Sequence, residues 1–201
     1  MNSTSLRNLT KKTLFLVSLA TAKRVSELQA LSRKVALQEF LAKTERAFNH
    51  LPREFRLKSL RPLVDPDDQK RLLCPVRALT YMLERSKNFS HKPRNLFISP
   101  SNTAKPLSKN ALSFLLKEII LQAHESFPEE FQQPLKIRAH DIRGIATLLN
   151  LSRNHSFMAI LEAASWKTPS VFANHYLKDL ERIDGDTYSL GPIVAADDIV
   201  R

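Results

Sequence analysis

Hydrophobic residues recur at helical spacing along most of the chain, and this spacing predicts a mainly helical protein. Thr10 and Ser108 are predicted to cap the first and fourth helices, because each hydroxyl precedes an apolar helical repeat. Pro75 suits the first position of the third helix, where no backbone N–H is needed. The predicted helices cover residues 10–20, 25–31, 75–86, 108–124, 140–151 and 157–164, and a seventh opens with Thr168 as cap and Pro169 at its first position.

A shorter part of the chain has the pattern of strands. Residues 34–41 place Val35, Leu37, Glu39 and Leu41 on one side, a period of two that predicts one strand. Residues 50–70 carry three prolines among many charges and predict a strand or two with irregular loops. The expected fold class is therefore α+β, mainly helical, with a small antiparallel sheet of about three strands packed on one side.

The carboxyl terminus differs in composition from the rest of the chain. We expect one domain over residues 1–180 and a separate tail over 181–201, acidic and containing glycine and proline. The tail is predicted to be poorly ordered, although residues 193–200 are apolar enough to dock on another surface. Residues 96–98 are expected to form a short buried run within the domain.

The net charge of the chain restricts the kind of partner that it is expected to bind. Thirty-one Lys and Arg against twenty Asp and Glu give a formal net charge of +11 and a pI near 10.0. This excess favours a polyanionic partner, but alone it does not separate DNA or RNA from an acidic membrane surface or a ribosomal neighbour. The longest apolar run, residues 14–22, is too short to span a bilayer, and no signal peptide is recognised. A single cysteine, Cys74, predicts a reducing compartment, cytosol or nucleus.

One short run has residues suited to opening a phosphodiester without a metal. Such a reaction needs a nucleophile, cations that neutralise the phosphate oxygens, and a proton donor for the leaving oxygen. Arginine suits the oxygens, because its planar fork donates two parallel hydrogen bonds and keeps its charge. His140 and Arg143 are three residues apart and are predicted to share one helix face near the helix amino end, which itself attracts phosphate. Gly144 follows directly, which indicates a close approach to the backbone there.

These residues belong to a longer pattern. His140-x-x-Arg143, followed by Trp166 and Tyr176, resembles the carboxy-terminal signature of tyrosine recombinases, and Arg24 with Glu27 resembles the amino-terminal arginine motif of that family. The similarity covers about residues 10–180. The runs Leu-Cys-Pro-Val-Arg-Ala-Leu (73–79) and Trp-x5-Phe-x3-Tyr-Leu (166–177) are similar to recombinases carried by eukaryotic mobile elements. Taken singly, each of these residues also has a purely structural interpretation. The arginine would be solvated, the histidine structural, the tryptophan part of the core and the tyrosine packed against its neighbours.

The resemblance implies a role for each matching residue. Arg24 and Arg143 would clamp the scissile phosphate, and His140 would assist proton transfer. Trp166 would donate a hydrogen bond from its indole N–H and pack the site. Tyr176 would be the nucleophile, and with an ordinary pKa near 10 its phenol needs the arginine field or a base to react.

Two supporting residues follow from the same resemblance. Glu27 would orient its neighbours without reacting. The family protonates the leaving 5′ oxygen with a lysine on a strand-loop-strand element. Lys43, at the end of the alternating residues, is the first choice for that lysine, and Lys58 is the reserve.

The implied activity is cleavage and rejoining of DNA through a 3′-phosphotyrosyl intermediate, as site-specific recombination or mobile-element integration. It implies a metal-independent enzyme without cofactor or small-molecule substrate, acting in the nucleus or cytoplasm, away from membranes. The partner would be double-stranded DNA, bound by a homotetramer whose protomers exchange the 181–201 tail. Two alternatives remain open: a type IB topoisomerase-like nicking and resealing enzyme, and a catalytically inactive DNA-binding descendant. A metallohydrolase is disfavoured, because no His-x-x-x-His or similar ligand spacing occurs.

The sequence departs from the family pattern in two places. The family often has glycine two residues before the first arginine, whereas this chain has Ala22, a change that the turn is expected to tolerate. The amino-terminal DNA-clamping (core-binding) domain typical of the family is also not recognised in the chain. The fragment is therefore expected to bind DNA weakly on its own.

Overall fold

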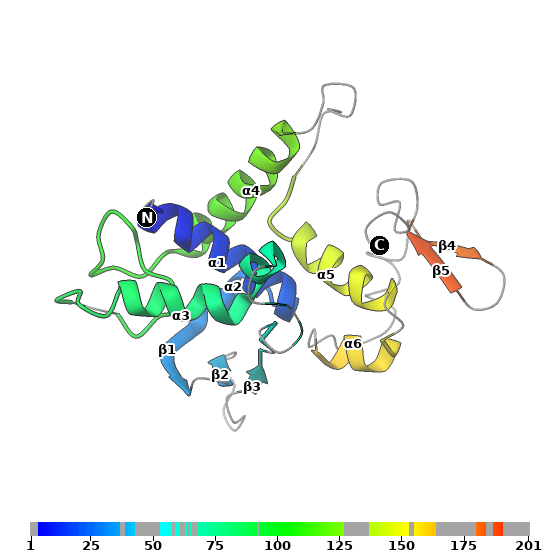
Figure 1. The fold of residues 1–201 in the computed structure, drawn as a ribbon, viewed down its shortest axis with the longest axis horizontal. Coiled ribbons are helices and arrows are strands. Elements are labelled where there is room, and N and C mark those ends of the chain that lie inside the picture. The colour runs from blue at the N-terminus through cyan, green and yellow to red at the C-terminus, as the bar shows by residue number, and fades with distance from the viewer. Residues whose placement is uncertain are drawn as a thin grey trace.

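In the computed structural model, the domain is built around one central helix, α1 (Figure 1). The described residues are 4–36, 39–42, 53–57, 59–60, 63, 65, 68–91, 93–126, 137–152, 155–163, 180–183 and 187–190. The helices are α1 (Leu6–Thr21), α2 (Val25–Ala30), α3 (Pro75–Arg85), α4 (Lys109–Glu125), α5 (Asp141–Ser152) and α6 (Phe157–Ala163), with a 3-10 helix η1 (Gln69–Leu73) before α3. α1 packs against α3, α4 and α5, and this arrangement confirms the mainly helical prediction.

The start of α1 lies earlier than the apolar repeat predicted. Ser5 is the N-cap, and its hydroxyl accepts a hydrogen bond from the Asn8 N–H at 3.1 Å. Thr10, the predicted cap, lies inside the helix and is buried, with its hydroxyl donating to the Leu6 carbonyl at 2.8 Å. The prediction was wrong because Ser5 satisfies a free N–H one turn and more before the apolar face begins.

Two other predicted helix starts follow local chemistry and are confirmed, whereas the start predicted at Thr168 and Pro169 lies outside the described residues. Ser108 caps α4, and its hydroxyl accepts from the Ala111 N–H at 3.1 Å. Pro75 is the first residue of α3, whose cap is the Cys74 thiol, accepting from the Arg77 N–H at 3.5 Å. The inner faces of α3 and α4 pack against α1 in one hydrophobic core. The buried residues of this core are Leu9, Leu14, Val17, Leu28, Leu31, Leu57, Leu79, Met82, Leu96, Phe97, Leu107, Leu112, Leu115, Leu116 and Ile142.

A three-stranded antiparallel sheet lies beside the helices, in the order β1 (Leu31–Ala36), β2 (Glu39–Ala42) and β3 (Arg53–Arg56). The single strand expected over 34–41 is wrong in extent, because the chain reverses between β1 and β2 and pairs Val35 with Phe40. The period of two over residues 34–41 spans parts of both strands, so the pattern alone does not mark the reversal.

A second antiparallel pair follows the helices: β4 (Leu180–Ile183) and β5 (Thr187–Leu190). β5 packs against α5, and Figure 1 shows the pair in orange at the carboxyl end of the described chain. The sequence did not predict these two strands, because the composition of a short segment does not reveal strand pairing.

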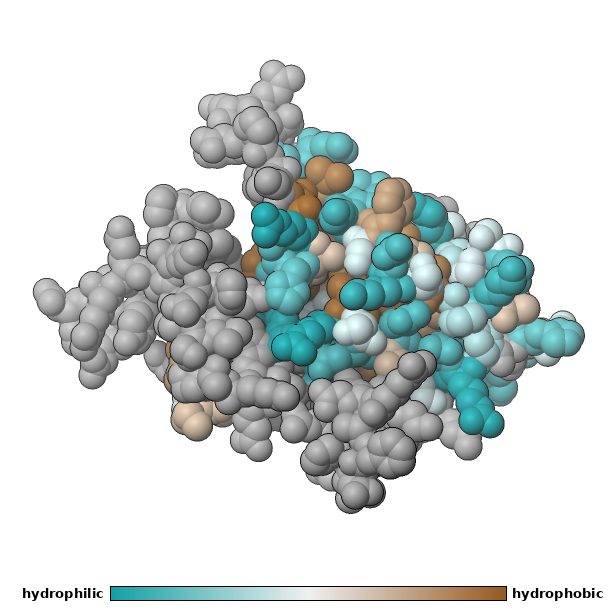
Figure 2. All heavy atoms as spheres, turned by 180° about the vertical axis from the view of Figure 1, so that it is seen from behind, coloured by the Kyte–Doolittle hydropathy of each residue, from teal (hydrophilic) through white to brown (hydrophobic). Residues whose placement is uncertain are grey.

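The face shown in Figure 2 carries mostly hydrophilic side chains in its described part, with apolar residues gathered in small patches. No described helix combines the length and hydrophobicity that crossing a membrane requires.

An ion-pair cluster joins α1 to α4. The Glu118 carboxylate accepts from Arg7 Nη2 at 2.5 Å and from Lys11 Nζ at 3.1 Å. Lys11 is only 6% exposed, and its ammonium also donates to Gln122 at 3.0 Å. Burial acts to raise the pKa of the Glu118 carboxyl, but the hydrogen bonds and charges of Lys11 and Arg7 outweigh it and hold that pKa below its usual value.

This cluster predicts a pH dependence of stability. A lowered carboxyl pKa stabilises the fold above the unfolded value of about 4.3, and this contribution is lost as the pH falls through the acid range. Glu118→Gln should therefore lower the Tm at pH 7, and its difference from the wild type should shrink below about pH 4. Glu125→Gln, at an exposed carboxylate on the same helix, is the control and should leave the Tm unchanged. A Glu118→Gln deficit of equal size at pH 7 and pH 3, measured by circular dichroism, would contradict the assignment.

Candidate functional site

The joint between α1 and α2 presents Arg24 to solvent. Arg24 is the N-cap residue of α2, and its backbone N–H donates to Glu27 Oε2 at 2.6 Å. The Arg24 carbonyl accepts from the Leu28 N–H at 2.9 Å, so both backbone groups of this residue are fixed. The Arg24 side chain is exposed, whereas Leu28 is buried and anchors the helix. Glu27 therefore holds the backbone from which the guanidinium projects.

Ala22 ends α1 in a left-handed conformation, with φ 49° and ψ 27°, and its N–H donates to the Ser18 carbonyl at 2.9 Å. This conformation costs an L-residue about 1–2 kcal/mol and is the usual place for glycine. The position at which the chain departs from the recombinase pattern is thus the one where glycine would be favoured. The Ala22 methyl is buried against Ala146 of α5, and burying one such carbon stabilises by about 0.8 kcal/mol. Packing offsets much of the backbone cost, which explains why alanine is tolerated.

This balance predicts opposite outcomes for two substitutions. Ala22→Gly should change the free energy of unfolding by less than about 1 kcal/mol, because backbone relief and methyl loss nearly cancel. Ala22→Val should destabilise by about 2–4 kcal/mol, since a β-branched residue is strained at positive φ and overfills the contact with α5. Ala20→Val, at an exposed position of the same helix, is the control and should cost less than about 1 kcal/mol. Urea denaturation measures all three, and an Ala22→Val variant as stable as Ala20→Val would refute the balance.

Helix α5 carries Arg143 on its inner side. Arg143 is 3% exposed, and Gly144 beside it is also buried. The Thr147 hydroxyl donates to the Gly144 carbonyl at 2.7 Å and to the Arg143 carbonyl at 3.1 Å, which ties down this turn of the helix. A buried guanidinium strongly attracts an anion, because the low dielectric around it weakens screening.

The helix predicted to begin at His140 begins one residue later. α5 begins at Asp141, and His140 lies in the turn before it, where its carbonyl accepts from the Arg143 N–H at 3.1 Å. His140 is exposed, whereas Arg143 is buried. Each of these two residues has a further interaction partner in the structure. The shared helix face predicted for these two residues stays a prediction.

The fold brings the two arginine-bearing segments together. Ala22, two residues before Arg24, forms a buried cluster with Ala146, three residues after Arg143, and Leu19 packs against both. Figure 1 shows α5 beside α1, and the two helices are in contact. Two segments that carry cationic residues and lie far apart in the sequence are thus neighbours in the fold. The side chains that join them, Ala22 and Ala146, are small.

Lys23 is a basic residue of this joint that the sequence did not single out. It is 8% exposed and has a partner in the structure. A lysine among many in a basic chain gives no signal of burial. The joint 22–24 and α5 together therefore bury two cationic side chains, Lys23 and Arg143, and expose a third, Arg24.

Four predicted site residues lie outside the described residues: Lys43, Lys58, Trp166 and Tyr176. β2 ends at Ala42, one residue before Lys43, and the buried Leu57 directly precedes Lys58. Among the residues that the structure describes, no group of three or more His, Cys, Asp or Glu side chains is placed to hold a metal ion.

Comparison with known proteins connects this fold to solved structures. No protein-family model and no curated protein sequence matches the chain. The XerH site-specific recombinase bound to palindromic difH is similar with a TM-score of 0.58 at 14% identity, over 86% of this chain and 43% of that one. The Tn1549 transposon integrase in complex with circular intermediate DNA is similar with a TM-score of 0.55 at 14% identity, over 84% and 54%. XerA recombinase gives 0.57 at 13% identity, over 84% and 57%.

The chain therefore spans about half the length of the solved proteins that it resembles. Identities this low concern the fold and not the chemistry. The chain shares the fold of these recombinase and integrase structures.

Proposed function

We propose that this protein cleaves and rejoins DNA strands through a covalent link between Tyr176 and a backbone phosphate. The observation that carries the proposal is the contact between Ala22 and Ala146, which brings the Arg24 joint against the helix bearing Arg143. Two arginines on adjacent segments suit a single phosphodiester, because each guanidinium donates paired hydrogen bonds to phosphate oxygens. The similarity to recombinases solved with DNA supports the same function.

The proposed chemistry is two successive transesterifications. The Tyr176 phenolic oxygen attacks the phosphorus, its proton passes to a base or to water, and the bond from phosphorus to the 5′ oxygen breaks. The 5′ oxygen takes a proton and leaves as a hydroxyl, and the strand keeps a 3′-phosphotyrosine. A hydroxyl from another strand then attacks the same phosphorus and releases Tyr176. The number of ester bonds is unchanged, so no nucleotide is consumed.

The remaining residues have assisting roles in this scheme. Arg24 and Arg143 stabilise the charge that develops on the phosphate oxygens, and His140, exposed at the start of α5, assists proton transfer. Trp166 donates its indole N–H to the phosphate and packs the site. Glu27 positions Arg24 through the backbone bond already described.

The proposed partner is double-stranded DNA, and the net charge of +11 agrees with such a polyanion. In the proposed assembly, four copies act on paired DNA sites and exchange the 181–201 tail. The proposed setting is a mobile element, with the protein acting in the nucleus or the cytoplasm. The exposed Arg24 and His140 are open to a duplex approaching from solvent.

A suicide substrate tests this function. The protein is incubated with duplexes nicked just beyond each candidate cleavage position, so that cleavage releases a short strand and religation fails. The proposal predicts a protein band that migrates more slowly by the mass of the attached DNA and survives denaturation. Binding without any such adduct would instead show a DNA-binding descendant without catalysis. Adducts with resealing of one duplex, but no exchange between two marked duplexes, would show a topoisomerase-like enzyme.

The leaving-group lysine has its own prediction. Lys43→Ala should slow cleavage by about 10²–10⁴-fold, the usual contribution of general acid catalysis, whereas Lys58→Ala should not. A substrate with sulfur in place of the 5′ bridging oxygen has a leaving group that needs no proton, so it should restore cleavage by Lys43→Ala. The reverse pattern, with Lys58→Ala impaired and rescued by sulfur, would reassign the general acid.

A further inference from the structure

A groove opens between α1, η1 and α3, away from the Arg24 joint. Lys12, which lines it, precedes Ala22 by ten residues, or about 15 Å along the helix. The cavity volume is about 620 Å³, within the range of about 300–1,000 Å³ found for ligand sites. The groove therefore has the size of a binding site and belongs to no step of the proposed chemistry.

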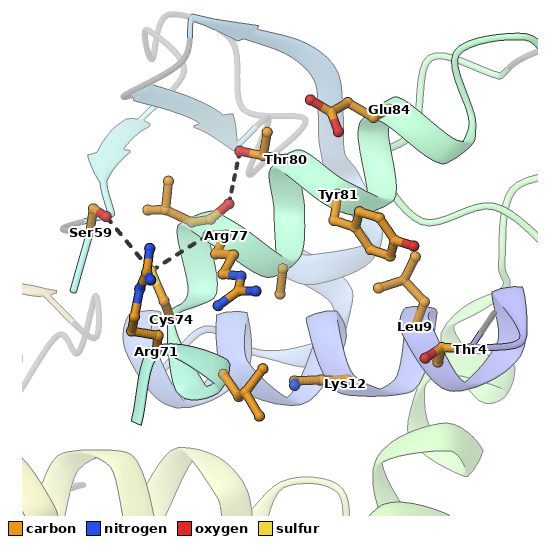
Figure 3. Close-up of a pocket in the computed structure, with 13 residues that line it drawn as sticks. Thr4, Leu9, Lys12, Ser59, Arg71, Cys74, Arg77, Thr80, Tyr81 and Glu84 are labelled. Carbon is orange, nitrogen blue, oxygen red and sulfur yellow. Dashed lines mark hydrogen bonds between the residues drawn. The ribbon is translucent and has the colours of Figure 1, made fainter. Parts of the chain in front are cut away.

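One end of the groove is cationic. Lys12, Arg71 and Arg77 line it, and Figure 3 shows the Arg77 and Lys12 side chains extending into the space between α3 and α1. Within the described ranges, neither Lys12 nor Arg77 lies within ion-pair distance of a carboxylate. The adjacent Lys11 differs, because its ammonium is held by Glu118 on the α4 side of the helix.

Apolar side chains line much of the rest of the groove, beside the polar residues Thr4, Ser59, Thr80 and Glu84. Leu9 and Val76 line its walls, while Leu72 and Tyr81 are 48% and 47% exposed along it. Leu73, the next residue of η1, is 60% exposed. Large hydrophobic side chains gathered beside a cavity are typical of an interaction surface, because a bound partner removes their apolar surface from water. The groove thus combines cations at one end with apolar walls along its length.

We propose that this groove binds a short acidic peptide segment with apolar side chains, carried by a partner protein. Its lining on α3 runs from Cys74 to Glu84, about 15 Å, which four or five residues of extended chain would cover. Carboxylates of the peptide would face Lys12 and Arg77, and its apolar side chains would cover the Leu9 and Tyr81 region. A DNA backbone fits less well, because it has phosphates for the cations but leaves the apolar walls uncovered.

Selection from a phage-displayed library of short random peptides tests this proposal. The wild-type protein should enrich peptides with net negative charge and apolar anchors, and fluorescence polarisation of synthetic copies gives their Kd. The double variant Lys12→Glu, Arg77→Glu should raise the Kd by about tenfold or more, and copies with Lys for Asp and Glu should bind that variant better than the wild type. Lys117→Glu, at an exposed lysine of α4, is the matched control and should leave the Kd unchanged.

Several results would overturn the inference. One is enrichment of no peptides, or of peptides whose Kd is the same for the wild type and the double variant. Another is a short DNA duplex that loses affinity in the double variant but not in Lys117→Glu, which would make the groove a nucleic-acid surface. Self-association lost only in the double variant would make the occupant a second copy of this chain. The double variant should still form the Tyr176 adduct, so failure of this proposal is distinguishable from failure of the proposed function, and the retained adduct shows that the variant folds.

Discussion

Tyr176→Phe is expected to abolish covalent attachment to DNA while leaving DNA binding unchanged. The substitution removes one oxygen atom, which is the proposed nucleophile, so adduct formation should fall by at least about 10⁴-fold. Binding rests on cationic contacts such as those of Arg24, which the variant keeps. Denaturing gels with a nicked duplex measure the adduct, and a gel shift under native conditions measures binding.

Tyr188→Phe is the matched control for this result. Tyr188 lies in β5, opposite Arg182, and no step of the proposed reaction uses its hydroxyl. Its variant should form the adduct at the wild-type rate. If Tyr176→Phe forms the adduct at that rate too, another residue is the nucleophile and the assignment of Tyr176 is wrong.

Arg143→Lys should reduce the cleavage rate by about 10²–10³-fold, even though the positive charge is kept. Lysine is a point charge, and it cannot reproduce the two parallel hydrogen bonds that a guanidinium donates to phosphate. Losing one donor that stabilises developing charge costs a factor of this size in other enzymes. Single-turnover cleavage of the suicide substrate measures the rate of the chemical step.

Arg143 is buried, so its variant needs a check of folding and a control arginine. Far-ultraviolet circular dichroism and Tm should show a folded protein. Arg138→Lys, at an exposed arginine before α5, makes the same change outside the proposed site and should cleave at the wild-type rate. A folded Arg143→Lys protein with wild-type cleavage would remove Arg143 from the phosphate clamp.

Features governed by local chemistry were predictable from the sequence. Ser108 and Pro75 fix helix starts because a hydroxyl or a ring acts on the backbone of its own helix, and both predictions are confirmed. The reversal between β1 and β2 and the pairing of β4 with β5 depend on backbone hydrogen bonds between two strands, which the pattern of apolar residues along the chain does not identify.

The candidate site also has some features that the sequence predicts and others that only the folded chain shows. The residue types in the run from His140 to Arg143 indicate phosphate chemistry, but their exposure depends on where α5 begins. The left-handed conformation of Ala22, its packing against Ala146 of α5 and the burial of Lys23 are visible only in the folded chain. The groove beside Lys12 arises in a similar way, because α1, η1 and α3 meet only in the folded chain.

Mass spectrometry of the covalent adduct tests the central claim most directly. The adduct is formed on a suicide duplex, trimmed with nuclease and digested with trypsin, which releases residues 168–178 as one peptide with Tyr176 as its single tyrosine. Fragmentation of that peptide should place a phosphate-linked nucleotide on Tyr176. A nucleotide on His175, on Ser170 or on a peptide from elsewhere in the chain would contradict the account.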